Sequence, residues 1–160
     1  MFTAFQSINV NGAMVAQLED DMLTVKLPLK RIGKSVHSSK GTSYKGHEFF
    51  EAASMRKFNG KYYFIYSSIN EHELCYAMGD NPMGEFEYKG TLVSIGDIGI
   101  SDKPLNTLGN THGSVEYINE KYYVFYHRHT NRHGFSRQAC AEEIKMLEDG
   151  TFKQAEITSA

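Results

Sequence analysis

Short runs of apolar and aromatic residues, each ended by a turn signal, follow one another along the chain. Lys61-Tyr62-Tyr63-Phe64-Ile65-Tyr66 comes directly after Phe58-Asn59-Gly60, and Asn-Gly between such runs is typical of a β-hairpin turn. Nearly the same run, residues 121–126, follows Ile118-Asn119-Glu120. Because aromatic and β-branched residues favour strands, the pattern predicts two antiparallel hairpins.

The two hairpins belong to an internal repeat of about 60 residues. Residues 54–58 and 114–118 precede the two turns at the same offset, 74–77 match 138–141 loosely, and 84–88 match 150–154. Each copy is predicted to form strand, turn, strand, loop, strand, turn, strand. A four-stranded antiparallel unit of this kind is typical of a propeller blade, although any two β-hairpins resemble each other to some degree.

The N-terminal part of the chain resembles a third, incomplete copy. Residues 12–18 are predicted to form a strand, Glu19-Asp20-Asp21 its turn, and residues 22–25 the outer strand, before a polar loop at 33–46. A propeller closes with roughly 4–8 blades, so 160 residues supply about two and a half of them. Either neighbouring blades lie on other sequence or several chains assemble.

The composition narrows the functional classes. With 41% hydrophobic and 22% charged residues, the chain has the composition of a globular protein. Its net charge of −2 gives no excess of positive charge that would favour binding to nucleic acid or an anionic membrane. No apolar run approaches the ~20 residues that a membrane-spanning helix needs. Two cysteines, Cys75 and Cys140, cannot form a disulfide framework, and the N-terminus shows no signal-peptide pattern. We therefore expect a cytoplasmic location for the chain as given, without nucleic-acid or membrane partners.

One acidic residue lies inside an apolar run, Phe49-Phe50-Glu51-Ala52-Ala53. If Phe49, Glu51 and Ala53 share one strand face, desolvation raises the pKa of Glu51 and keeps the carboxyl protonated near neutral pH. A protonated carboxyl is what a general acid requires. The alternative is a solvated or ion-paired glutamate at a strand end.

A histidine occupies the corresponding place in the next repeat. The 60-residue offset aligns Glu51 with Thr111, and His112 is the next residue. Both side chains are therefore expected at equivalent places on adjacent inner strands, within about 10 Å of each other by analogy with packed sheets. The alternative is a core histidine with its hydrogen bonds satisfied.

A third group contains His127, Arg128 and His129, with Arg132 and His133 nearby. His127 and His129 share a strand face, a spacing that zinc or copper can use. Since no cysteine or acid stands beside them, we predict a loop that contacts substrate and no closed metal site.

Taken in order, these segments resemble glycoside hydrolase family 43, the five-bladed propeller enzymes that act on arabinose- and xylose-containing glycans. Residues 49–57 with 60–63 resemble the segment of blade three that carries the general acid, and residues 74–77 and 84–90 continue it. Asn110-Thr111-His112-Gly113-Ser114 is similar to the blade-four segment whose histidine faces the central channel. Residues 123–127 and Ser136-Arg137-Gln138 complete the match, and residues 14–25 resemble outer blade two.

The resemblance implies an all-β fold, a β-propeller of the five-bladed type with about two and a half blades present. The chain would be one partial domain, with residues 1–32 ending blade two, 45–100 forming blade three and 105–160 forming blade four. Glu51 would be the general acid of an inverting hydrolase, and His112, Arg137 and His127 would contact a pentose-containing oligosaccharide or polysaccharide. No cofactor would be required, but His112 would reach a structural calcium through water.

The chain also departs from the family pattern. The general base, an Asp on blade one, and the Asp on blade two that tunes the acid would both precede residue 1, so no residue here takes either role. An inverting enzyme needs an acid and a base about 6.5–9.5 Å apart, so we expect a partial chain that is inactive alone. Two alternatives are a non-catalytic carbohydrate-binding half-propeller and a blade protein that self-associates through open blade edges.

Overall fold

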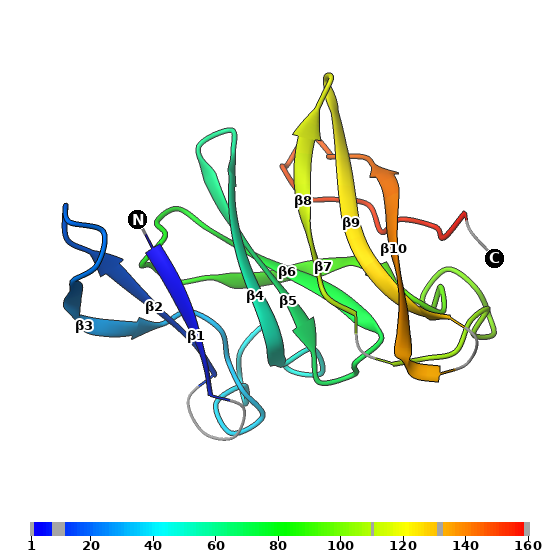
Figure 1. Ribbon diagram of the computed structural model, residues 1–160, viewed down its shortest axis with the longest axis horizontal. Helices are drawn as coiled ribbons and strands as arrows, with labels where there is room; N and C mark the ends of the chain where they lie inside the picture. The colour runs from blue at the N-terminus through cyan, green and yellow to red at the C-terminus, as the bar shows by residue number, and fades with distance from the viewer. Residues whose placement is uncertain (1, 8–11, 110, 131–132, 159–160) are drawn as a thin grey trace.

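The computed structural model describes residues 2–7, 12–109, 111–130 and 133–158, which form three antiparallel sheets and, within these ranges, no helix (Figure 1). The first sheet has the order β1 (Phe2–Ser7), β2 (Gly12–Leu18), β3 (Val25–Arg31). The second has the order β4 (Phe49–Phe58), β5 (Lys61–Ser68), β6 (Glu73–Gly79), β7 (Glu87–Ser94). The third has the order β10 (His133–Ile144), β9 (Lys121–Thr130), β8 (Gly113–Ile118).

The predicted all-β fold is confirmed, and it contains three consecutive sheets that pack side by side (Figure 1). Over the described ranges, no helical segment has the length and apolar character needed to cross a membrane.

Strand β4 is the edge of the second sheet that meets both neighbouring sheets, since it packs against β1 and β2 on one side and β8 on the other. The hydroxyls of Ser54 and Ser114 are 2.9 Å apart, and Arg56 Nε donates to Glu116 Oε1 at 2.7 Å. Both pairs are separated by 60 residues in sequence. Equivalent positions of the repeat therefore contact each other where the second and third sheets meet.

The two hairpin turns have the same backbone conformation. Asn59 and Asn119 both have φ of 49°, and the next residues, Gly60 and Glu120, have φ of 83° and 65°. The flanking pairs are Phe58 with Lys61 and Ile118 with Lys121. Positive φ at both central residues is the signature of a type I′ turn, which matches the twist of the strands it joins.

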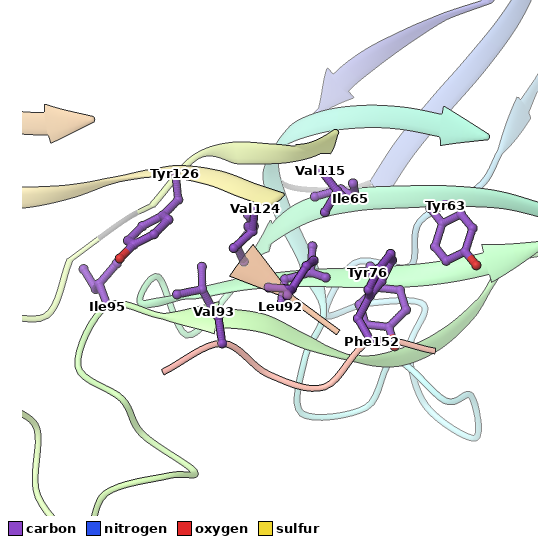
Figure 2. Packing of buried hydrophobic residues seen from close by; sticks show 13 residues of the cluster. Tyr63, Ile65, Tyr76, Leu92, Val93, Ile95, Val115, Val124, Tyr126 and Phe152 are labelled. Carbon is purple, nitrogen blue, oxygen red and sulfur yellow. The ribbon is translucent and has the colours of Figure 1, made fainter. Parts of the chain in front are cut away.

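Two apolar clusters hold the three sheets together. One lies between the first and second sheets and includes Ala13, Val15, Phe49, Phe64 and Tyr66. The other joins the second and third sheets and is drawn in Figure 2, where Tyr63 and Tyr76 lie on one side and Val115 and Val124 on the other. Each pair of neighbouring sheets thus shares a core, and β5 contributes to both.

The turn after β2 is longer than the sequence predicted. Asp21 Oδ1 accepts hydrogen bonds from the amides of Leu23 at 2.9 Å and Thr24 at 2.8 Å, and Glu19 N donates to Thr24 O at 2.8 Å. This side-chain cap holds residues 19–24 in a closed loop, as Asp commonly does in turns. The strand therefore starts at Val25, and the predicted outer strand at 22–25 is wrong.

The C-terminal segment also differs from the repeat. Residues 150–154 were expected to form a fourth strand, but the third sheet has three strands among the described residues. Phe152 bridges to Met146, and Ala155 bridges in parallel to Val93, with Ala155 N donating to Leu92 O at 2.8 Å. The segment is held instead by the second sheet, because Phe152 is buried among the aromatic rings of the shared core (Figure 2).

Candidate active site

Glu51 is placed by two irregularities in β4. The pairing with β5 shifts register between Phe49 and Glu51 and again between Glu51 and Ser54, and Ala52 has φ of 59°. Bulges of this kind redirect a side chain and are common beside functional sites. The strict alternation assumed from the sequence is therefore wrong: Phe49 is fully in the core, whereas the Glu51 side chain is 19% exposed.

His112 meets Glu51 from the third sheet. Its Nε2 lies 2.7 Å from Glu51 Oε1, a distance typical of a short hydrogen bond between an imidazole and a carboxyl group. His112 comes directly before β8, where the neighbouring Thr111 is fixed by its hydroxyl, which donates to His127 O at 2.7 Å. A Cβ at Gly113 would lie 2.0 Å from Phe125 O, so only glycine permits this close approach of the backbones.

His127 and Arg137 extend this pair into a row of four side chains. The rings of His112 and His127 are 5.0 Å apart in an edge arrangement, and Arg137 Nη1 lies 3.5 Å from His127 Nε2. Burial, together with the positive charges of His112 and Arg137, lowers the pKa of His127 to about 4. His127 is therefore neutral near pH 7, and its Nε2 lone pair faces the Arg137 guanidinium. The structure brings together the four side chains to which the family resemblance assigned roles in the site.

Glu51 opens onto a cleft of about 570 Å³. The residues that line it come from β4, the β5–β6 loop, the β7–β8 loop and β9: Phe50, Glu51, Glu71, Thr107, Leu108, Gly109 and His129. The sequence reasoning missed Glu71 and the wall at 107–109, because they lie in loops that carry no motif. Position 109 is a glycine because the His129 ring approaches its backbone closely, and a Cβ there would lie 2.1 Å from His129 Cε1.

The third histidine group is divided by the fold. His129 lines the cleft, whereas His133 begins β10 and is exposed, and Arg132 lies outside the described residues. Among the described residues, metal-binding donors gather in a group of three at His47, Glu73 and Cys75.

Known proteins resemble this chain over most of its length, although no family model matches it. A "Xylosidase/arabinosidase" from Thermoclostridium stercorarium is 50% identical over 153 residues, covering 92% of this chain and 32% of the relative. A "Beta-xylosidase" from Xylanibacter ruminicola is 46% identical over 81 residues, covering 51% of this chain and 22% of the relative. The chain thus spans about a third or less of these relatives.

Solved structures show the same partial coverage. A GH43 β-xylosidase/α-arabinofuranosidase from a compost microbial metagenome, solved with xylotriose in a calcium-free form, is 31% identical with a TM-score of 0.71. The match covers 90% of this chain and 42% of that one. A GH43_1 enzyme from Xanthomonas citri is 25% identical with a TM-score of 0.71, covering 90% and 42% of the two chains.

Proposed function

Because this chain belongs to glycoside hydrolase family 43 and spans only part of a member's length, we propose that it is part of a glycosidase that hydrolyses xylose- or arabinose-containing glycans. The observation that carries the proposal is the contact of Glu51 with His112 at the mouth of a cleft. The three sheets would be consecutive blades, within residues 1–32, 45–100 and 105–160.

Glu51 acts as the general acid in this proposal. Its carboxyl group is mostly shielded from solvent yet lines the cleft, so it can hold a proton and deliver it to the glycosidic oxygen of a bound glycan. His112 is a positioning residue, because its ring contacts one carboxyl oxygen of Glu51 and holds the orientation of the carboxyl group. Arg137 and His127 would contact the sugar beyond His112.

The general base is proposed to come from sequence outside these 160 residues. An inverting reaction places that carboxylate about 6.5–9.5 Å from the acid, with the attacking water between the two groups. Glu71 is the second carboxylate that lines the cleft among the described residues, and its side chain is exposed. We assign Glu71 to substrate contact, and the experiment below tests this assignment against a role as base.

We propose calcium only as a neighbour of His112 that is reached through water. Calcium prefers oxygen ligands, and the His112 Nε2 that faces Glu51 is already engaged with a carboxyl oxygen. No group of three His, Cys, Asp or Glu donors includes His112 among the described residues. The fit to a directly bound ion is therefore poor, and no step of the proposed reaction depends on one.

A chimera tests the function. This chain replaces the corresponding 153-residue segment of the 50% identical Thermoclostridium stercorarium protein. The rest of that protein then supplies the missing parts of the fold. We expect the chimera to hydrolyse xylo-oligosaccharides and nitrophenyl pentosides, and the isolated chain to be nearly inactive on both. In the chimera, Glu51→Gln should lower kcat/KM on xylo-oligosaccharides by about 10²–10⁴-fold. The same variant should lower kcat/KM on nitrophenyl pentosides much less, since nitrophenolate is a good leaving group that needs little protonation.

One variant serves as a control, and a second tests the role of Glu71. Glu87→Gln changes an exposed carboxylate on β7 and should leave both activities unchanged, while Glu71→Gln should raise KM more than it lowers kcat. Equal rates for the Glu51→Gln and unmodified chimeras on xylo-oligosaccharides would overturn the assignment of the acid. A folded chimera that binds xylo-oligosaccharides without cleaving them would favour the carbohydrate-binding alternative.

A further inference from the structure

A compact group of three metal-type donors lies outside the cleft, on the second sheet. Glu73 and Cys75 are alternate residues of β6 and project from the same face, and His47 lies in the loop that precedes β4. His47 Nδ1, a Glu73 carboxylate oxygen and Cys75 Sγ all lie within 4.8 Å of one another. The proposed hydrolysis uses none of the three.

We propose that His47, Glu73 and Cys75 form a binding site for a zinc-class divalent metal ion. The separations from Glu73 Oε2 are near those of tetrahedral coordination, one of them slightly shorter. Zn–N and Zn–O bonds near 2.0–2.2 Å and a Zn–S bond near 2.3 Å place N and O about 3.3 Å apart, and S and O about 3.5 Å apart. In the structure, His47 Nδ1 lies 2.9 Å and Cys75 Sγ 3.5 Å from Glu73 Oε2. The ion would replace the hydrogen bond between His47 and Glu73, and these two side chains would move slightly apart to admit it.

The surroundings hold the donors in place. The His47 ring stacks on Tyr88 with ring centroids 4.5 Å apart and planes 8° apart, which fixes its orientation. Ser68 Oγ and Asn70 Nδ2 donate to Glu73 Oε2 at 2.7 and 3.0 Å. Partners of this kind orient ligands in metal sites and tune their affinity. A third of the His47 side chain is exposed, which leaves a path for the ion and for a water as fourth ligand.

Charge balance also favours a divalent cation. Glu73 and Cys75 are both buried, with 8% and 0% of their surface exposed. A divalent ion would displace the proton of the Cys75 thiol to solvent and form a metal–thiolate bond. The carboxylate and the thiolate would then neutralise its two positive charges.

Cobalt(II) titration of the intact chain tests the site, because a cobalt–thiolate bond gives a charge-transfer band in the near ultraviolet that histidine and carboxylate ligands do not give. We expect one equivalent of cobalt to produce this band and zinc(II) to abolish it by displacement. Cys140→Ser changes the chain's other cysteine and should leave the titration unchanged.

Ligand variants identify the donors. Cys75→Ser should remove the band, and His47→Gln should weaken cobalt binding by at least about 10–100-fold, the loss seen even when outer-shell partners of a metal are mutated. Far-ultraviolet circular dichroism checks folding, and His47→Gln is the informative variant if Cys75→Ser does not fold, because His47 is partly exposed. Absence of the band in the unmodified chain, or its persistence in Cys75→Ser, would overturn the proposal.

Discussion

Glu48 is a single buried carboxylate that ties down the loop between the first two sheets. Ser39 Oγ donates to its Oε1 at 2.7 Å, Lys45 Nζ approaches the same oxygen at 3.2 Å, and Gly46 N donates to Oε2 at 3.1 Å. Glu48 itself is only 2% exposed. A buried carboxylate with this many donors is strongly stabilised in its charged form.

Acid should therefore destabilise the protein through Glu48. Burial works to raise its pKa, but the hydrogen bonds from Ser39, the Gly46 amide and Lys45 outweigh burial and lower the pKa to about 2. A pKa that is lower in the folded than in the unfolded chain contributes stability above the unfolded value, about 4.3, which is lost as pH falls toward 2. The contribution is on the order of 3 kcal/mol.

Urea unfolding at pH 7, 4.5 and 3 measures this effect. Glu48→Gln should be less stable than the unmodified chain at pH 7, and the difference should shrink as pH falls below 4.5. Glu85→Gln, at an exposed position, should follow the unmodified chain at every pH. A constant difference between Glu48→Gln and the unmodified chain would contradict the prediction.

The sequence predicted the closeness of Glu51 and His112 for a physical reason. Equivalent positions of a repeat occupy equivalent places on neighbouring sheets, and the 60-residue offset located both residues. The same reasoning missed Glu71 and Gly109, because loop residues are positioned by tertiary packing rather than by a local pattern. It also missed the bulges at Glu51, since alternation of apolar residues carries no sign of an inserted residue.

At the scale of elements, the two hairpins form a natural comparison. Both turns use positive φ at both central positions, but the second position is Gly60 in one turn and Glu120 in the other. A residue with a Cβ is destabilised by roughly 1 kcal/mol or more at positive φ, whereas glycine is not. The β8–β9 turn is therefore strained relative to the β4–β5 turn.

Exchanging these residues should have opposite effects. Glu120→Gly is expected to stabilise the chain by roughly 0.5–1 kcal/mol, and Gly60→Glu to destabilise it by a similar amount. A Cβ at Gly60 would meet nothing within 4 Å, so a loss there reports backbone strain rather than a collision. Thermal or urea unfolding of the two single variants and the double variant provides the measurement. Destabilisation by Glu120→Gly would show that the Glu120 side chain contributes more than its backbone strain costs.

Elements with strong local turn chemistry were predictable, and those that depend on long-range packing were not. Asn-Gly and Asn-Glu between aromatic runs located both hairpins correctly. The segment 150–154 matched the repeat in its aromatic position, yet Phe152 is held by the second sheet and forms no regular strand. The C-terminal segment packs against the sheet that offers it apolar surface, and the local sequence does not encode where that surface lies.

At the scale of the whole molecule, the outer sheets carry exposed apolar side chains. Leu27 on β3 is 80% exposed, and Phe135 on β10 is 92% exposed. Within the described part of the chain, both strands are edges of their sheets, so one row of their backbone groups has no partner strand in the sheet. Open edges beside apolar side chains are prone to pairing with other chains. In the proposed full propeller, neighbouring blades from outside this sequence would pack against the outer faces of the first and third sheets.

The isolated chain is therefore expected to self-associate. Sedimentation velocity over a hundredfold range of concentration should show a shift from monomer to larger species, because association through exposed edges follows mass action.

Leu27→Lys and Phe135→Lys each place a charge beside one edge strand and should move the transition to higher concentration, with a larger effect in the double variant. Asp80→Asn changes the net charge by the same +1 on an exposed turn, and its transition should stay close to that of the unmodified chain. The chimera described above, in which the missing parts of the fold are supplied, should remain monomeric under the same conditions. Monomeric behaviour of the isolated chain throughout the range would show that its open edges are protected by the chain itself, and association unaffected by either lysine would place the contact on another face.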